Sequence, residues 1–310
     1  MNTQGTCAVW RPAMLALLAL CVLLLFVGGP DAQSTRSLRQ GWQFGHVLLF
    51  FMAARLALPF FRRRFGAGAS VALVLLAAAL LGALVEWLQG FVGREVSWAD
   101  VRLDVIGAAL GSTAVGAGRA RWILPAFALV LLTWLDALPL GRALLDEYRA
   151  RRDFPVLASW ASDLELGRMQ PAAGMRREHA PERPGEHALR VLLQPAPYAG
   201  FHLQYFPGDW RGDGELEISL YLPPNAPGSI TCRVHDAAHD NRFSDRLNRR
   251  FAVAPGWNRL GIPLADIRLA PREREMDMAR IQGVGCFFTA LREEVEIRVG
   301  KIALLPAGAP

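Results

Sequence analysis

Residues 70–89 read SVALVLLAAALLGALVEWLQ, an apolar run that ends in a glutamate and a glutamine. A helix needs about 20 apolar residues to cross the ~30 Å hydrocarbon core of a bilayer, and residues 69–88 reach that length. The run therefore predicts a transmembrane helix with Glu86 and Gln89 at one end. A charge at the centre of such a helix costs about 3 kcal/mol on insertion scales, so these side chains need a partner, water or a function.

Four further apolar segments surround this run, at residues 13–27, 42–61, 103–117 and 122–140. The first also fits a signal peptide, but Pro30 stands where a cleavage site prefers a small residue, so we favour a retained anchor. The segment 103–117 contains Asp104 and is rich in glycine and alanine, which lets helices approach closely in lipid. Residues 1–140 are therefore expected to form a multi-pass α-helical membrane bundle of about five helices.

The orientation of this bundle follows from Arg62, Arg63 and Arg64, which predict a cytoplasmic loop. The loops at 28–41 and 89–102 then lie outside, and residues 141–310 are exported. We expect a bacterial inner-membrane protein whose C-terminal domain lies on the periplasmic or extracellular side.

The chain of 310 residues is 52% hydrophobic with a net charge of +6. It lacks a clustered basic stripe, so the expected partner is the lipid bilayer and not a nucleic acid.

Polar side chains gather at one depth near the outer surface of the expected bundle. They are His46, Glu86, Gln89, Arg94, Asp100 and Asp104. A catalytic interpretation makes Glu86 or Asp100 a general base and His46 a proton shuttle. Gln89, Arg94 and Asp104 would then bind the substrate, with Arg94 on a phosphate. The alternative is an ion-paired network that locks the helices without chemistry. Metal binding is less favoured, and neither a metal nor a cofactor is predicted.

The spacing of these residues forms a pattern: a helix ending in Glu-x-x-Gln, an arginine in the next loop, then Asp-x-x-x-Asp-x-x-Gly-x-x-x-Gly. Over roughly residues 40–118 this pattern resembles the VanZ-like family, named for a teicoplanin-resistance membrane protein. The resemblance implies a link to glycopeptide resistance and site residues at Glu86, Gln89, Arg94, Asp100 and His46. Two features depart from it. Asp104 stands where the family has asparagine, and the family's Asp-Lys before the histidine is absent.

The second half of the chain has a different periodicity. Residues 141–153 are rich in arginine and predict a short helical linker before a domain at 154–310. Residues 215–222 alternate polar and apolar side chains, as a half-buried strand does. Seven more strands are expected near residues 189–193, 201–206, 230–235, 250–253, 258–262, 283–288 and 295–305. Short strands separated by proline and glycine turns predict an all-β jelly-roll sandwich.

The turns of this domain carry Gly208-Asp209-Trp210, His235-Asp236, Asp245-Arg246 and Gly256-Trp257-Asn258. These motifs resemble the galactose-binding-like jelly rolls used as carbohydrate-binding modules. The resemblance implies a sugar site built from Trp210, Trp257, Asp236, Asp245 and Arg246. The alternative places Trp257 in the core and pairs Asp245 with Arg246 on the surface. A cation held by His235, Asp236, His239 and Asp240 is the least favoured interpretation.

Two cysteines of this half, Cys232 and Cys286, fall in expected strands. Outside the cytoplasm they would form a disulfide, and otherwise they would be two buried thiols.

Three functions stay open. The protein binds or processes an envelope polysaccharide or lipid-linked glycan, is an integral-membrane enzyme, or is a non-enzymatic scaffold or sensor with a protein partner. We favour the first, because the sequence contains no recognisable hydrolase, nucleotide-binding or metalloprotease motif.

Overall fold

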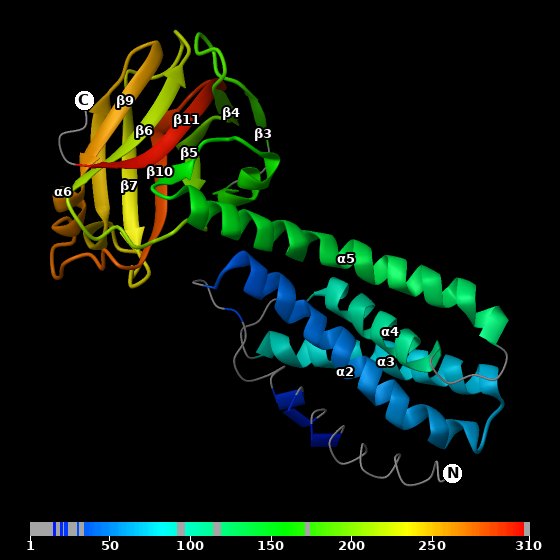
Figure 1. The fold of residues 1–310 in the computed structure, drawn as a ribbon. Coiled ribbons are helices and arrows are strands. Elements are labelled where there is room, and N and C mark those ends of the chain that lie inside the picture. The colour runs from blue at the N-terminus through cyan, green and yellow to red at the C-terminus, as the bar shows by residue number, and fades with distance from the viewer. Residues whose placement is uncertain are drawn as a thin grey trace. The chain divides into compact units, whose positions relative to one another are not determined.

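The computed structural model describes residues 34–91, 97–113, 119–170 and 174–306, with isolated positions between 15 and 30; at 119–128 it describes the backbone alone. The chain divides into two compact units, Met1–Gly141 and Arg142–Pro310. The first is helical and the second is built mainly of strands (Figure 1).

Four helices make up the described part of the first unit and its continuation: α2 (Arg36–Arg62), α3 (Ala67–Phe91), α4 (Trp98–Thr113) and α5 (Arg119–Asp153). By length and composition, α2 and α3 are able to cross a membrane. The predicted bundle of five spans is therefore not supported. The predicted segment 103–117 belongs to α4, which has only 16 residues. The predicted segment 13–27 lies largely outside the described residues.

The faces of α3 are the reverse of those of a helix in a soluble protein. Its buried positions are mainly small or polar: Ser70, Val74, Ala78, Gly82, Glu86 and Gln89. Its exposed positions include Leu80 at 64% and Trp87 at 60% exposure. Soluble proteins rarely leave such large apolar faces in contact with water. The sequence of α3 thus directs leucines outward and polar groups inward.

Glycines bring α4 against α2. A Cβ atom on Gly107 would lie 2.4 Å from the carbonyl oxygen of Val47, and one on Gly111 would lie 2.6 Å from that of Phe51. Only hydrogen atoms fit in such gaps, so the two backbones touch along a Gly-x-x-x-Gly face. The close packing expected from the small residues of this segment is confirmed.

The last turns of α5 belong to the second unit. Asp146 and Arg168 are both buried, and they form a bidentate pair with Nη2–Oδ1 and Nε–Oδ2 distances of 2.7 and 2.8 Å. Arg168 also donates to the carbonyl oxygen of Leu157. Helix α5 therefore has no break at residue 140, and Asp146 near its C-terminal end contacts Arg168 at the start of the strand region.

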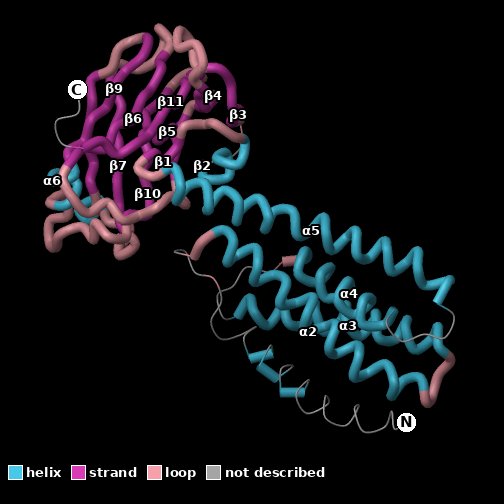
Figure 2. Tube along the Cα trace, viewed as in Figure 1, coloured by secondary structure: helices cyan, strands magenta, loops and turns pink. Residues whose placement is uncertain are grey.

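Two antiparallel sheets form the second unit (Figures 1 and 2). One has the order β3 (Met175–His179), β4 (His187–Leu193), β11 (Val295–Pro306), β6 (Gly214–Leu222) and β9 (Gly256–Pro263), with β1 (Val156–Ala158) beside β11. The other has the order β2 (Met169–Gln170), β5 (Ala196–Leu203), β10 (Ile281–Leu291), β7 (Ser229–Asp236) and β8 (Leu247–Ala252). A short helix, α6 (Leu264–Arg268), follows β9. The prediction of a β-sandwich is confirmed.

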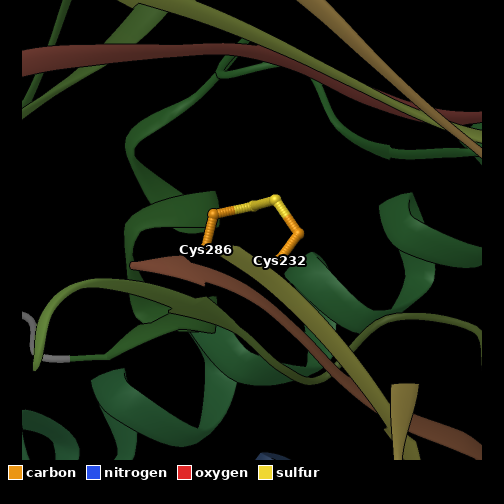
Figure 3. The surroundings of a disulfide bond; sticks show 2 residues. All are labelled: Cys232 and Cys286. Carbon is orange, nitrogen blue, oxygen red and sulfur yellow. A yellow bond between two sulfur atoms is a disulfide. The ribbon is translucent and has the colours of Figure 1, made fainter. Parts of the chain in front are cut away.

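The core of the sandwich lies between the two sheets. Alternate residues of β7 (Ile230, Cys232 and Val234) are buried in it, as the two-residue period of a strand requires. Cys232 and Cys286 are joined by a disulfide that links β7 to β10 (Figure 3). Of the two alternatives for these cysteines, the structure has the disulfide.

Candidate functional site

The outer face of the five-stranded sheet carries the candidate site. Because side chains alternate along a strand, the neighbours of the buried cysteines point away from the core. Thr231 and Arg233 on β7 therefore share the outer face with Phe287 on β10. Thr231 stands opposite both Arg250 and Phe287, while Arg233 stands opposite Asn248 and Gly285.

A groove of about 880 Å³ runs over this face. Its lining comes from β2, β5, β10, β7, β8 and the segment before β8. Gly200 is part of this lining, and a Cβ atom there would lie only 2.1 Å from the carbonyl oxygen of Cys286 on β10. Glycine at this position therefore allows β5 and β10 to approach each other closely beneath the groove.

Aromatic rings stand along the groove. Tyr198 is 74% exposed and Phe243 is 68% exposed. The ring of Tyr198 meets that of Phe287 edge to face, with centroids 5.6 Å apart. Large exposed rings on a regular sheet are costly to leave in water and commonly mark a binding surface.

Hydrogen-bonding side chains lie between these rings. Arg246 donates to Asn248 Oδ1 at 3.2 Å, and its guanidinium lies 5.8 Å from the ring of Phe243. Arg250 donates to Ser229 Oγ at 2.7 Å. The remaining polar groups of the lining are Gln170, His202, Thr231, Arg233 and Thr289. The groove thus combines apolar faces with a surplus of donors.

Two histidines stack beneath one end of the groove. The rings of His202 and His235 are parallel to within 5°, with centroids 5.4 Å apart. Burial, followed by the charges of Arg233 and His235, lowers the pKa of His202 to about 3. Burial, followed by His239 and Arg233, lowers the pKa of His235 to about 4. Both rings are therefore neutral at physiological pH, and the charge of the groove comes from its arginines.

The sequence-predicted tryptophans lie elsewhere. Trp210 is 1% exposed and packs in the core, so its ring offers no face to a sugar. Trp257 is on β9 of the opposite sheet, where its Nε1 donates to the carbonyl oxygen of Pro181 and Arg183 covers its ring at 3.9 Å. The turn motifs that drew attention to both residues serve the packing of the sandwich.

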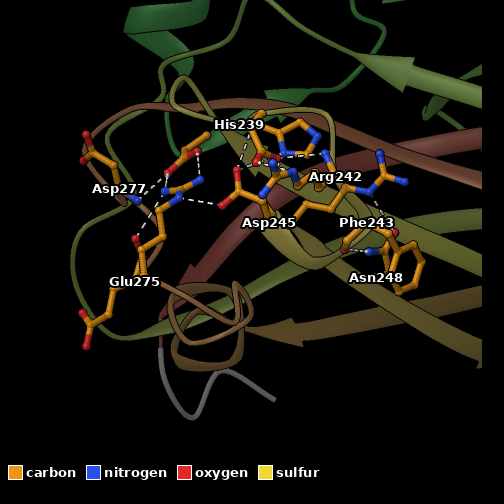
Figure 4. Close-up of polar contacts among 11 residues, drawn as sticks. His239, Arg242, Phe243, Asp245, Asn248, Glu275 and Asp277 are labelled. Atoms are coloured by element: carbon orange, nitrogen blue, oxygen red, sulfur yellow. Dashed lines mark hydrogen bonds and ion pairs between the residues drawn. The ribbon is translucent and has the colours of Figure 1, made fainter.

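The predicted Asp236 and Asp245 belong to a structural ion-pair network (Figure 4). Arg274 donates to Asp236 from Nη1 and Nη2 at 2.5 and 2.8 Å, and to Asp245 from Nε at 2.6 Å. Burial alone would raise the pKa of Asp236, but the hydrogen bonds from Arg274 and the Asp277 amide outweigh it and lower that pKa. Arg274 links its own loop to the end of β7 and to the short 3-10 helix Phe243–Asp245. Sequence reasoning missed it, because a loop arginine carries no periodic signal.

The alternative interpretation, an ion pair between Asp245 and Arg246, is wrong, since Asp245 pairs with Arg274 and Arg246 lines the groove. The side chains of His239, Asp240 and Asp245 lie close enough to surround a cation. Arg274 already donates a hydrogen bond to Asp245 from Nε, so its guanidinium balances the charge of the Asp245 carboxylate without a metal. Among the five predicted sandwich residues, only Arg246 lines the groove.

The polar residues of the helical unit form a second cluster. His46 Nδ1 lies 2.9 Å from Asp104 Oδ1, and His46 Nε2 lies 4.0 Å from Asp100 Oδ2. Glu86 accepts a hydrogen bond from the amide of Ser97 at 2.7 Å. Side chains from three helices, α2, α3 and α4, are thus brought together.

This cluster is buried rather than open. His46, Glu86, Gln89 and Asp104 are each at most 3% exposed. Gly82 leaves the space that the carboxylate of Asp104 occupies, because a Cβ there would lie 2.3 Å from Oδ2. Ligand atoms of His46, Glu86 and Asp100 lie within 4.8 Å of one another. Arg94, the sixth predicted residue, lies outside the described residues.

Comparisons with known proteins concern the sandwich. A family 11 carbohydrate-binding module from Clostridium thermocellum, in complex with a β-1,3-1,4-mixed-linked tetrasaccharide, is 13% identical, with 49% of this chain and 95% of that chain covered and a TM-score of 0.37. A family 30 carbohydrate-binding module of a cellulosomal cellulase of the same organism is 11% identical. The match covers 44% of this chain and 83% of that chain, with a TM-score of 0.34. An exo-β-agarase is 12% identical. That match covers 50% of this chain and 25% of the agarase chain, with a TM-score of 0.40.

These TM-scores lie below 0.5, so the assignment of the fold rests on the sheet order itself. Neither a protein-family model nor a curated protein matches this chain. The resemblance to the VanZ-like family therefore stays a prediction.

Proposed function

We propose that this chain is a membrane-anchored polysaccharide-binding protein of the bacterial envelope. The observation that carries the proposal is the groove on the five-stranded sheet, where Tyr198, Phe243 and Phe287 stand beside arginine, asparagine and glutamine side chains. Sugar rings present apolar C–H faces and hydroxyl edges. Aromatic rings pack against the faces, and side-chain donors and acceptors bond to the edges.

The dimensions of the groove favour a polymer over a small molecule. Its lining spans the sheet from β2 to β8. Strands in a sheet lie about 4.8 Å apart, so five strands give a surface roughly 19 Å wide. A run of several sugar units fits along such a surface, whereas small-molecule sites are more often enclosed.

Three features support an anchored, exported sandwich. The first is the reversed polarity of α3, which turns Leu80 and Trp87 outward and Glu86 inward, as expected of a helix in lipid. The second is the disulfide between Cys232 and Cys286, because disulfides persist in oxidising compartments outside the bacterial cytoplasm. The arginine triplet at 62–64 favours a cytoplasmic loop between α2 and α3.

The helical cluster has a structural role in this proposal. The bond between His46 and Asp104 ties α2 to α4, and the bond from Ser97 to Glu86 ties α3 to the start of α4. Such links hold transmembrane helices in register. A catalytic role for Glu86 in processing a lipid-linked glycan is the competing hypothesis.

The test is binding of the full-length chain, in detergent micelles, to a panel of bacterial exopolysaccharides and cell-wall glycans by isothermal titration calorimetry. Tyr198→Ala is the site variant, and Leu269→Ala is the control, because Leu269 is also exposed but lies outside the groove. Saturable binding that only Tyr198→Ala weakens supports the proposal. Absence of binding to every glycan contradicts it and favours a scaffold with a protein partner.

A further inference from the structure

We propose that the groove selects polysaccharides that carry carboxylate groups, such as uronic-acid polymers. The inference rests on the proposed function and names the class of its ligand. It starts from the charges of the lining, which among the described residues contains Arg233, Arg246 and Arg250 and no aspartate or glutamate. The groove is therefore a cationic surface with aromatic walls.

These three arginines differ from others of the sandwich. On the opposite sheet Arg190 pairs with Glu296, Arg259 with Glu215, and Arg298 with Glu178. On β8 itself, Arg249 pairs with Asp266 while the adjacent Arg250 bonds only to the hydroxyl of Ser229. Among the described residues, the groove arginines have no carboxylate partner, although the fold supplies one to their neighbours.

Arg233 is the most informative of the three. It is partly buried on the interior strand β7, between Asn248 on β8 and Gly285 on β10. It makes no hydrogen bond or ion pair with a described residue, and its guanidinium lies 6.0 Å from the ring of Phe287. Burial and the charge of Arg246 lower its pKa, which means that this position disfavours its positive charge. The negative charge of an incoming anion would offset that penalty.

The geometry suits a planar acid on a sugar. A guanidinium presents a fork of N–H donors that binds a carboxylate through two parallel hydrogen bonds. Arg233 and Arg250 stand on adjacent strands at diagonal positions, which places their Cα atoms about 7–8 Å apart. Successive acidic units of one polymer could meet both, while Phe243 and Tyr198 pack against the ring faces. A neutral glucan would leave the arginine charges uncompensated.

The test compares each acidic polymer with its neutral counterpart on the same backbone. The probes are polygalacturonate, alginate and hyaluronan, each alongside its methyl-esterified form, titrated into the full-length chain in detergent. Dextran sulfate separates carboxylate recognition from general anion exchange. The variants are Arg233→Gln and Arg246→Gln, with Arg292→Gln as control, because Arg292 is exposed, lies outside the groove and removes the same charge.

We expect at least one acidic polymer to bind about tenfold more tightly than its methyl ester, which corresponds to about 1.4 kcal/mol. Arg233→Gln should weaken that binding about tenfold, while Arg292→Gln stays within about twofold. Equal affinity for acid and ester, equal losses in Arg233→Gln and Arg292→Gln, or dextran sulfate as the tightest ligand would overturn the inference. Binding confined to neutral glucans would also overturn it, yet leave the proposed function standing. Absence of any glycan binding would reject both.

Discussion

Cys232 on β7 and Cys286 on β10 stand directly opposite each other, and their disulfide joins the two strands on the face of the sheet that packs in the core. The next residue on each strand, Arg233 and Phe287, faces the groove on the other side. One pair of adjacent strands therefore supplies both the covalent link in the core and part of the groove. A change in the register of these strands by one residue would exchange the two faces.

Loss of the disulfide should destabilise the sandwich. The bond closes a loop with a sequence separation of 54 residues, and disulfides of this kind contribute about 2–4 kcal/mol by restricting the unfolded chain. We expect the double variant Cys232→Ala, Cys286→Ala to unfold at a lower temperature in calorimetry. Thiol alkylation of the denatured, non-reduced protein supplies the check: if Cys232 and Cys286 react without a reductant, the disulfide is absent.

Arg274→Ala should be among the most damaging single changes in the sandwich. It leaves the carboxylate of Asp236, which is fully buried, without its ion-pair partner. Breaking a buried pair in this way costs about 3–5 kcal/mol. The matched control is Arg280→Ala, whose exposed pair with Asp277 contributes about 1 kcal/mol or less. Equal unfolding temperatures for the two variants would show that the network does not hold the loops.

Acid should weaken the sandwich from pH 6.5 downward. His202 and His235 titrate near pH 6.5 when unfolded, but their folded pKa values are about 3 and about 4. Below pH 6.5 the unfolded chain binds protons that the folded chain does not, so the free energy of unfolding falls as pH falls towards these values. Each unit of pKa difference corresponds to about 1.4 kcal/mol.

The histidine contribution is separable from that of the carboxylates. Asp245, with its pKa lowered to about 2 by Arg274, loses its stabilising charge only below its ordinary value near 4. Between pH 6.5 and 4.5 the decline should therefore come from the histidines. In His202→Gln, the unfolding temperature should therefore fall less steeply between pH 6.5 and 4.5. A slope equal to that of the unchanged chain would contradict the role of His202 in this decline.

The helical cluster should govern stability and not ligand affinity. His46→Ala leaves the buried carboxylate of Asp104 without a hydrogen-bond partner from α2, at a cost of about 1–3 kcal/mol. We expect a lower unfolding temperature in detergent with unchanged glycan affinity. Glu86→Gln keeps the hydrogen bond from Ser97 and should be mild in both measurements. A glycan-processing activity that Glu86→Gln abolishes without unfolding would favour the enzyme hypothesis.

The two-residue period and the alternation of polar and apolar side chains were enough to predict the sandwich. The alternation at 215–222 lies in β6, and each of the eight expected strands has a counterpart in the structure. The short strands β1, β2 and β3 were missed, since two to five residues are too few to show a period. In the helical unit, helix ends and small residues were sufficient to place His46, Glu86, Asp100 and Asp104 together.

The groove could not be predicted from sequence. Tyr198, Arg233, Phe243 and Phe287 lie far apart along the chain and carry no motif, so only the pairing of β5, β10, β7 and β8 brings them onto one face. Tryptophans next to turn motifs drew the sequence interpretation to Trp210 and Trp257 instead. Their positions are set by burial and by the Pro181 contact, neither of which composition reveals.

The most direct test of the central claim is a comparison of affinities for one bound polysaccharide between Phe243→Ala and Trp257→Ala in the full-length chain. Both changes remove an aromatic ring from the sandwich, but only Phe243 lines the groove. If the groove is the binding site, Phe243→Ala should lower the affinity for the polysaccharide about tenfold or more, and Trp257→Ala should change it little. A loss confined to Trp257→Ala would place the ligand on the opposite sheet and contradict the account.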